Sequence, residues 1–261
     1  LGDFQKAIDY YEQALSIAKE VGDKKGEGNW LGNLGNTYNS LGDYRKAIDY
    51  LEQALSIARE IGDKKGEGNW LGKVGNAYYG LGDYPKAIDF YEQALRIAKE
   101  IGDKREERNW FGNIGLAYDR LGDYPKAIVY LEQALSISKE IGDKHEEGRS
   151  LGNIGKAYDS LGNYPMAIDY LEQALCISRE IGDKQEEGNR LGELGRAYDS
   201  LGDYTKAIVY HEQALRISRE TGDKIGEGSW LHNLGVTYDR LGDYPKAIDY
   251  YGQSLSLFRP M

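Results

Sequence analysis

The most constraining feature of this sequence is a unit that returns every 40 residues without insertion or deletion. The stretch from Leu41 to Ala58 recurs with small changes from Leu1, Leu81, Leu121, Leu161, Leu201 and Leu241. A fixed period in this range is typical of a solenoid or similar array, in which each unit buries its apolar faces against its neighbours. Length therefore sets the number of repeats, and we expect residues 1–261 to form a single array.

Each unit contains the signals of two helices. In the segment 62–101, Asp63 is placed to cap a first helix that runs to about Gly80, and Pro85 lies in the first turn of a second helix. The first helix, helix A, carries an apolar stripe with spacings of three and four: Leu71, Val74, Tyr78 and Leu81. Short loops between helices of this length predict antiparallel packing of helix A on the second helix, helix B.

The pattern predicts an all-α chain that begins with a lone helix B and continues with six A/B pairs. The lone helix takes residues 1–23, and the repeats lie near 24–63, 64–103, 104–143, 144–183, 184–223 and 224–261. Neither end resembles a polar cap. We therefore expect partly bare apolar side chains at one end (Tyr10, Tyr11, Leu15 and Ile17) and at the other (Tyr251, Leu255 and Phe258). The chain also opens in mid-repeat, which we interpret as a piece of a longer protein.

These residues resemble the tetratricopeptide repeat (TPR) pattern. Leu34-Gly35-x2-Tyr38 matches its helix A part, and Ala47-x3-Leu51 followed by Ala54 matches its helix B part. The unit departs from the pattern in having 40 residues rather than 34, no closing Pro, and tryptophans one residue early, as at Trp30. It resembles the arrays of LGN/Pins, kinesin light chain and bacterial or invertebrate multidomain proteins. The resemblance implies a right-handed superhelix whose helices A line a concave face that binds peptide segments of other proteins.

A second stripe of helix A, the polar stripe, varies between copies and is where we place specificity. Its amide side chains donate and accept, which suits the backbone of an extended peptide. In the last repeat it consists of Ser229, Asn233, Val236 and Arg240. The residues that we assign to a peptide-binding groove are Asn29, Asn33, Asn36, Asn69, Lys73, Asn76, Tyr79, Asn109, Asn113, Leu116, Arg149, Asn153, Lys156, Arg196 and Asn233.

This prediction makes the groove rich in amides in its N-terminal half and locally basic near Arg149, Lys156 and Arg196. The alternative is that the stripe is a solvated surface that drifts freely. Asp159 follows Lys156 by three residues and Asp199 follows Arg196 by three, so each cation has a candidate partner in its own helix. The tryptophans, by contrast, are expected to pack between repeats rather than to cage a ligand.

No catalytic or metal-binding constellation emerges from the sequence, and no cofactor is predicted. His145, His211 and His232 stand at unrelated repeat positions, which gives neither metal-ligand nor triad spacing. The net charge of -10 argues against nucleic acid as a partner, and no apolar run approaches the ~20 residues of a membrane span. The single Cys176 fits a reducing, cytoplasmic location.

Three functional hypotheses remain open on these grounds. The first is a non-catalytic scaffold that binds a protein or peptide partner along the concave face. The second is the regulatory or sensor arm of a larger signalling ATPase or protease. The third is a self-assembling or engineered repeat protein, associating end to end through its uncapped terminal repeats.

Overall fold

The computed structural model describes residues 2–257, and within them every regular element is an α-helix. Two compact units are distinguished, one ending at Ile137 and one beginning at Ser138, and the break falls inside α7. The helices are α1 (Gly2–Val21), α2 (Lys24–Ser40), α3 (Tyr44–Glu60), α4 (Lys64–Leu81), α5 (Tyr84–Ile101), α6 (Lys104–Arg120), α7 (Tyr124–Glu140), α8 (Lys144–Ser160), α9 (Tyr164–Glu180), α10 (Lys184–Leu201), α11 (Tyr204–Thr221), α12 (Lys224–Leu241) and α13 (Tyr244–Leu257).

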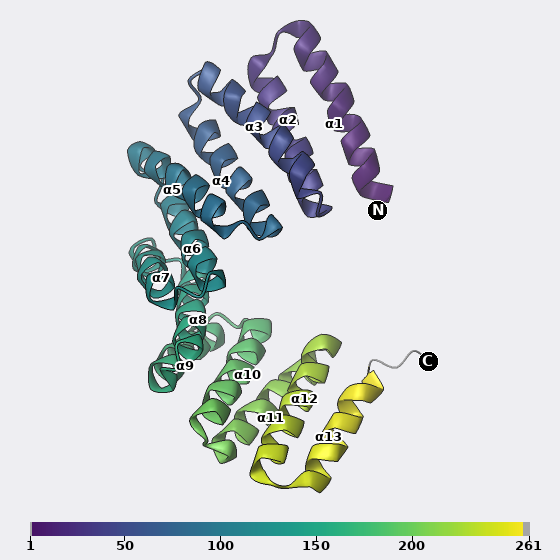
Figure 1. Ribbon diagram of the computed structural model, residues 1–261, viewed down its shortest axis with the longest axis vertical. Coiled ribbons are helices and arrows are strands. Elements are labelled where there is room, and N and C mark those ends of the chain that lie inside the picture. Colours follow the sequence, from purple (N-terminus) through teal and green to yellow (C-terminus); the bar gives the residue numbers. More distant parts are fainter. Residues whose placement is uncertain (1, 258–261) are drawn as a thin grey trace. The chain divides into compact units, whose positions relative to one another are not determined.

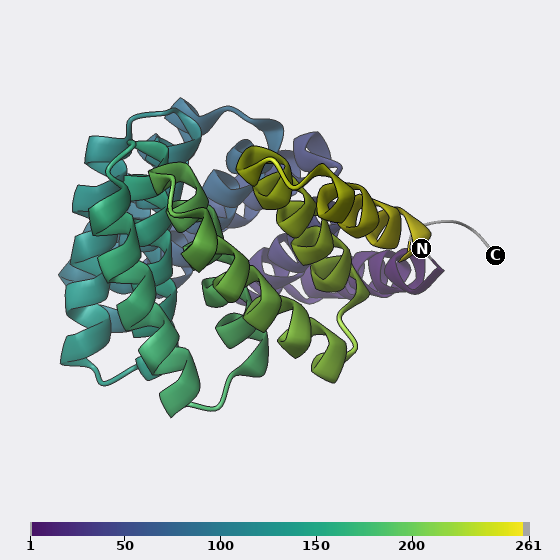
Figure 2. The ribbon, with the colours of Figure 1, turned by 90° about the horizontal axis from the view of Figure 1, so that it is seen from below.

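The expected all-α array of one lone helix followed by six A/B pairs is confirmed. In each unit, successive helices pack side by side, for example α2 on α3 and α3 on α4 in the first and α10 on α11 and α11 on α12 in the second (Figures 1 and 2). Helices A of adjacent repeats also touch one another, as α2 does with α4 and α10 with α12. The helices A therefore form one layer within a unit and the helices B another.

The same dipeptide makes the turns. Gly82 adopts a left-handed φ of 81°, which a side chain disfavours, and it ends α4. The next residue, Asp83, accepts a hydrogen bond from the backbone N–H of Lys86 at 3.3 Å and so caps α5. Because Gly-Asp, or Gly-Asn at 162–163, stands at every turn from residue 22 to 243, the chain reverses at a fixed interval.

Glycines inside helix A let helix B of the same pair approach closely. A Cβ added to Gly155 on α8 would lie 2.7 Å from Cγ of Leu171 and 3.2 Å from the carbonyl oxygen of Ala167, both on α9. The expected close passage of a backbone beside these glycines is therefore observed. The neighbour that takes the space is a core leucine together with an alanine carbonyl of helix B.

Replacing Gly155 with alanine should destabilise the protein by about 1–3 kcal/mol, because the methyl group overpacks this contact. Gly252 on α13 is the matched control, since no atom lies within 4 Å of where its Cβ would stand. Gly252→Ala should stabilise by roughly 0.5–1 kcal/mol through helix propensity alone. Urea denaturation followed by circular dichroism measures both, and equal shifts of the same sign would contradict the close-contact explanation.

The tryptophans pack between repeats, as expected. The indole of Trp70 on α4 lies directly against Gly32 on α2, and Trp230 on α12 lies in the same way against Gly192 on α10. At the position equivalent to Trp230, α10 carries Arg190, whose guanidinium group covers Gly152 on α8. Arg190 is only 5% exposed, so a cation occupies a slot that is aromatic in other repeats.

The exposure of the terminal helices agrees with the prediction in part. Tyr10 is 70% exposed and Ile17 is 59% exposed, because none of the described helices covers their side of α1, and Leu255 on α13 is exposed too. The prediction that Leu15 is partly bare is wrong: only 9% of this residue is exposed, because α2 covers its face of α1. Tyr11 is half-buried and stacks on Trp30 at 5.9 Å. Tyr251 is half-buried as well, and Phe258 lies outside the described residues.

Candidate functional site

The structure leaves all fifteen residues of the predicted groove at least partly exposed. Of the predicted apolar stripe, Leu71 and Val74 are buried and Tyr78 is half-buried, but Leu81 at the helix end is 43% exposed and does not belong to the buried face. In the first unit, Asn29 and Asn69 are exposed, and the others are half-buried: Asn33, Asn36, Lys73, Asn76, Tyr79, Asn109, Asn113 and Leu116. In the second unit, Arg149, Lys156 and Arg196 are exposed, whereas Asn153 and Asn233 are half-buried. Leu34 and Val74 of the apolar stripe are fully buried. Each unit thus presents a polar row on its helices A.

Two contacts hold the polar stripe of the first unit in place. The hydroxyl of Tyr91, which is buried in helix B, donates to the side-chain oxygen of Asn76 at 2.8 Å. Burial raises the pKa of Tyr91, so this hydroxyl keeps its proton. Nε of Arg120 on α6 donates to the hydroxyl of Tyr79 on α4 at 3.1 Å. The side chains of Asn76 and Tyr79 are therefore oriented from helices other than their own.

The predicted basic cluster of the second unit lies among acidic side chains. Arg149 pairs with Glu146 at 2.6 Å, and Nζ of Lys156 on α8 pairs with Glu193 on α10 at 2.8 Å. Asp159 does not bond Lys156 but lies in the field of Arg196, and Asp199 pairs with Arg240 on α12. Lys156 and Asp199 thus find their partners on the next helix A, whereas Arg149 pairs within α8. Because each cation has an acid beside it, this region is not a basic patch.

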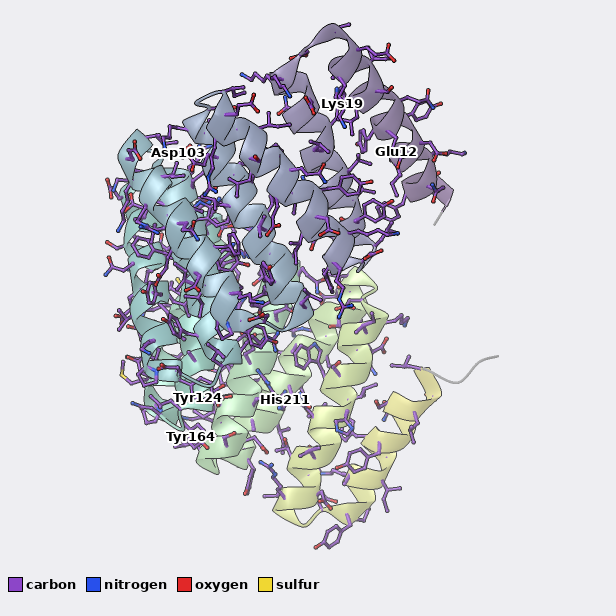
Figure 3. The ribbon with its side chains drawn as sticks, turned by 45° about the horizontal axis from the view of Figure 1, so that its top comes forward. Glu12, Lys19, Asp103, Tyr124, Tyr164 and His211 are labelled. Carbon is purple, nitrogen blue, oxygen red and sulfur yellow. The ribbon has the colours of Figure 1, made fainter. Side chains whose placement is uncertain are left out.

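One cavity of the second unit opens among these charges, and we call it the His211 pocket. It has a volume of about 240 Å³ and takes its walls from α8, α10, α11 and α12. Figure 3 labels His211 on α11. The pocket is lined by Asp159, Arg196, Asp199, Ser200, His211, Asn233, Val236, Thr237 and Arg240. Arg196 and Asn233 are groove residues predicted from the sequence, and the structure brings them together here.

Three buried polar atoms of the His211 pocket make no hydrogen bond within the described part of the chain. They are Oδ1 of Asp159, Oδ1 of Asp199 and Nδ1 of His211. Asp199 is 9% exposed and His211 is 1% exposed, so water reaches neither side chain freely. Buried polar atoms are nearly always paired in folded proteins, and an unpaired one costs about 1–3 kcal/mol. Three such atoms around one cavity mark it as a candidate binding site.

The electrostatics of the His211 pocket follow from burial. Burial raises the pKa of the Asp159 carboxyl above its usual range, with Arg196 opposing the shift and Glu193 adding to it. Burial, together with the nearby positive charge of Arg196, lowers the pKa of His211 to about 4. His211 is therefore neutral at pH 7. Its ring stacks on that of Trp230 with the centroids 6.3 Å apart.

Sequence patterns did not single out His211, Asp159 or Asp199 as site residues. His211 occupies the helix B position that is leucine at Leu51, Leu131 and Leu171 and tyrosine at Tyr91 and Tyr251. A polar residue at an otherwise apolar repeat position is the signal that would have found it. For the two aspartates, spacing along the sequence indicates only partners within their own helices, because their surroundings depend on which side chains face them from α10, α11 and α12.

Among residues 2–257, no three His, Cys, Asp or Glu side chains are grouped so as to hold a metal ion. His145 lies 3.8 Å from Asp183, and His232 packs on Tyr251 with the ring centroids 5.5 Å apart. None of the described helices combines the length and apolarity needed to cross a bilayer.

Comparison with known proteins decides the family. The tetratricopeptide repeat model matches residues 1–60, 66–140, 106–180 and 186–259, which is nearly the whole sequence. The chain is a tetratricopeptide repeat protein. None of the curated proteins matches this TPR chain.

Several solved structures resemble this TPR protein. BtubC (BKLC) from P. vanneervenii is 22% identical with a TM-score of 0.75, over 84% of this chain and 92% of its own. A STAND protein with a TPR sensor, PH0952 from Pyrococcus horikoshii, is 23% identical with a TM-score of 0.79, over 94% of this chain and 38% of its own. A Rap protein complexed with Competence and Sporulation Factor is 16% identical with a TM-score of 0.65, over 96% of this chain and 84% of its own. At these identities the likeness establishes the all-α solenoid fold.

Proposed function

We propose that this TPR protein is a non-catalytic interaction module that binds a peptide segment of a partner protein along the polar stripe. The observation that supports it most directly is the exposure of that stripe on successive helices A, beside core residues such as Leu71 and Val74 that are buried. Variable polar side chains on a rigid layer of helices are suited to recognising a ligand without changing the core. The Rap protein similar in fold is complexed with Competence and Sporulation Factor, which supports binding by such a solenoid.

The chemistry of the polar stripe fits a peptide backbone. Asn33 and Asn36 on α2 and Asn76 on α4 each offer an amide donor and an acceptor, and all three are half-buried. Side chains held this way lose less conformational entropy on binding than freely rotating ones, and Asn76 is fixed further by Tyr91. An extended peptide alternates N–H and C=O groups, so a row of amides satisfies it without requiring one particular sequence.

A display selection with random peptides on the immobilised chain tests this proposal. Selected peptides should bind the native chain and lose roughly tenfold or more in affinity for a variant carrying Asn36→Ala, Asn76→Ala, Lys156→Glu and Arg196→Glu. The matched control changes Asp49, Asp89 and Asp169 to alanine; all three are exposed on helices B. Peptides that bind the native chain and the polar-stripe variant equally well, or a selection that enriches no peptide at all, would contradict the proposal.

The charged part of the stripe carries a prediction of its own. Reversing Lys156 and Arg196 to glutamate together should weaken acidic peptides more than neutral ones, because it removes two cations that face Glu193 and Asp159. Affinities of one selected peptide and its Asp/Glu-to-Asn/Gln analogue, measured by calorimetry on both chains, give the comparison. If the affinities of both peptides fall by the same factor, Lys156 and Arg196 do not distinguish ligands by charge.

A second candidate function is the sensor or regulatory arm of a larger signalling ATPase or protease. The structure that favours it is PH0952, described as a STAND protein with a TPR sensor, of which this chain matches 38% of the length. The sequence of the full-length gene product distinguishes between the two functions. A nucleotide-binding or protease domain beside the array, with hydrolysis that responds to a ligand of the array, would favour the sensor.

We further propose that copies of the chain associate end to end. Tyr10, Ile17 and Val21 expose apolar surface on α1, and Ile248 and Leu255 expose it on α13. In the repeats between them, the residues equivalent to Ile17 and Leu255, such as Ile57 and Leu55, are buried, and a second copy would cover the terminal ones in the same way. Sedimentation velocity should show concentration-dependent association that Ile17→Glu and Leu255→Glu each abolish. A monomer at several hundred micromolar (roughly the range in which weak contacts of this kind appear) would rule the association out.

The location and the excluded partners remain proposals that rest on composition. Cys176 is exposed, and no second cysteine exists in the sequence to pair with it, which fits the cytoplasm. The net charge of -10 opposes binding to phosphate backbones. A nitrocellulose filter assay with single- and double-stranded DNA should therefore retain no complex at moderate salt.

A further inference from the structure

We propose that the His211 pocket binds a primary ammonium group of a peptide partner, either a lysine side chain or an N-terminal amine. The inference deepens the proposed function, on which the peptide origin of the group rests. The pocket has more buried acceptor atoms than donors to pair with them. Oδ1 of Asp159 and Oδ1 of Asp199 accept no hydrogen bond, and Nδ1 of His211 has no partner either.

The number and kind of these atoms match an ammonium group. A primary ammonium has three N–H donors and no acceptor, and it asks for three acceptors around it. Two of the pocket's unpaired atoms are carboxylate oxygens, and hydrogen bonds between a cation and a carboxylate are stronger than neutral ones. The third belongs to a neutral imidazole, whose Nδ1 accepts when the proton is on Nε2. The volume of about 240 Å³ leaves room for the end of one side chain.

The neutrality of His211 removes a charge that would repel the ligand. The ring is 1% exposed and its pKa is lowered to about 4, so it carries no proton charge at pH 7. It is held in place by the stack on Trp230 and by the close approach of the Gly195 backbone, where a Cβ would lie 2.5 Å from its Nδ1. His211 thus forms a fixed, uncharged part of the pocket wall.

The two arginines of the pocket do not exclude a cation from its floor. Arg196 is exposed, and the Arg240 side chain is 48% exposed, so solvent screens both charges. Arg240 is already paired with Asp199. The unpaired acceptor atoms, by contrast, are buried, where interactions with charge are stronger. Burial raises the pKa of Asp159 even though Arg196 opposes the shift, so a further cation beside this carboxylate would stabilise its charged form.

The equivalent place in the first unit is closed by the protein itself, which makes it a natural comparison. Tyr91 stands where His211 does, and its hydroxyl donates to Asn76 at 2.8 Å. That repeat therefore satisfies its buried polar group with a neighbouring helix A. In the His211 repeat, Nδ1 of the ring has no such partner on helix A, and the ligand's ammonium group takes that role.

The test uses small amides and so does not depend on finding a peptide. Two probes carry the primary ammonium: N-acetyl-lysine N-methylamide has it on a side chain, and glycine N-methylamide has it at the N-terminus. Two others are controls: N-acetyl-Nε-acetyl-lysine N-methylamide lacks the charge, and N-acetyl-arginine N-methylamide carries a guanidinium group instead. Each is titrated into the full chain while nuclear magnetic resonance follows the His211 ring and the Trp230 indole N–H. At least one primary ammonium probe should give saturable shifts at both groups, and the better of the two identifies the source.

Variants of the chain make the result specific to the pocket. Asp159→Asn and Asp199→Asn should each weaken the ammonium probe about tenfold or more, because each removes one charged acceptor without changing its shape. Asp169→Asn, at an exposed position of α9, should leave it unchanged. Absence of saturable shifts, equal binding of the acetylated or guanidinium probe, or insensitivity to both aspartate variants overturns the assignment. A peptide selection that fails while the amides bind would overturn the proposed function alone.

Discussion

Because of His211, the native protein is expected to lose about 2 kcal/mol of its free energy of unfolding between pH 7 and pH 5, and His211→Leu should abolish this loss. The folded protein holds His211 neutral, since burial and the nearby Arg196 lower its pKa from 6.5 to about 4. Between these two pH values the unfolded chain binds a proton that the folded chain does not. Stability therefore falls as the pH falls through this window, at up to about 1.4 kcal/mol per pH unit.

Leucine is the natural replacement because it fills this position in three other repeats, as at Leu171. It has no proton to take up and no unpaired nitrogen to bury, so the variant should be at least as stable as the native chain at pH 7. Urea unfolding at pH 7 and pH 5, followed by tryptophan fluorescence and by hydrogen exchange of α10 to α12, measures the difference. The regional readout is needed because repeat arrays can unfold in parts.

The control for this prediction is the exposed His145, changed to glutamine. His145 lies near Glu146 and Asp183 at the surface, and its replacement should leave the loss of stability from pH 7 to pH 5 as it is. If the leucine variant at position 211 loses as much stability in acid as the native chain does, the buried imidazole is not the group responsible.

The helices, their turns and their buried faces were predictable because the information for each lies within a few residues. Gly82-Asp83 fixes both a left-handed turn and a cap, and Leu71 with Val74 marks the inner face three residues apart. Repetition reinforces each signal, since a chance pattern would not return at a constant interval. The error at Leu15 arose where this logic needs a neighbour: the residue belongs to the face that the following helix covers.

The candidate site was predictable only in outline, because its chemistry is made between repeats. The three-residue spacing within one helix predicts that Asp199 pairs with Arg196, whereas in the structure it pairs with Arg240, 41 residues further on. Which side chain reaches across depends on lengths, rotamers and the spacing of the helices A. The same holds for His211, whose position could be recognised as unusual from the repeat but whose pocket required the residues of α8, α10 and α12.

Breaking the network of buried charges around Arg190 is also expected to cause a large loss of stability. This guanidinium lies in the slot that tryptophan fills in other repeats, and it bonds Glu186 as well as Glu193, the latter at 2.5 Å. Glu193 in turn pairs with Lys156 at 2.8 Å. Glu193→Asn should cost about 3 kcal/mol, because it leaves a 5% exposed cation with only one acidic partner, and breaking a buried pair costs about 3–5 kcal/mol.

Adding Arg190→Trp to Glu193→Asn should restore most of that loss. The double variant recreates the pairing of the first, third and last full repeats, where Trp30 stands with Asn33, Trp110 with Asn113 and Trp230 with Asn233. An indole fits against a glycine at the equivalent slots, as Trp230 does against Gly192. Replacing a buried ion network with well-packed apolar groups is often neutral or stabilising, so the double variant should lie within about 1 kcal/mol of the native chain.

Urea midpoints of the native chain, both single variants and the double variant form a double-mutant cycle for this prediction. Glu212→Asn, at an exposed position of α11, is the control for the helix propensity of asparagine and should change stability by well under 1 kcal/mol. A strongly favourable coupling means that Arg190 and Glu193 depend on one another and entered the repeat as a pair. Additive effects would instead mean that Lys156 and Glu186 each satisfy their partner alone, and that the slot accepts either residue independently of position 193.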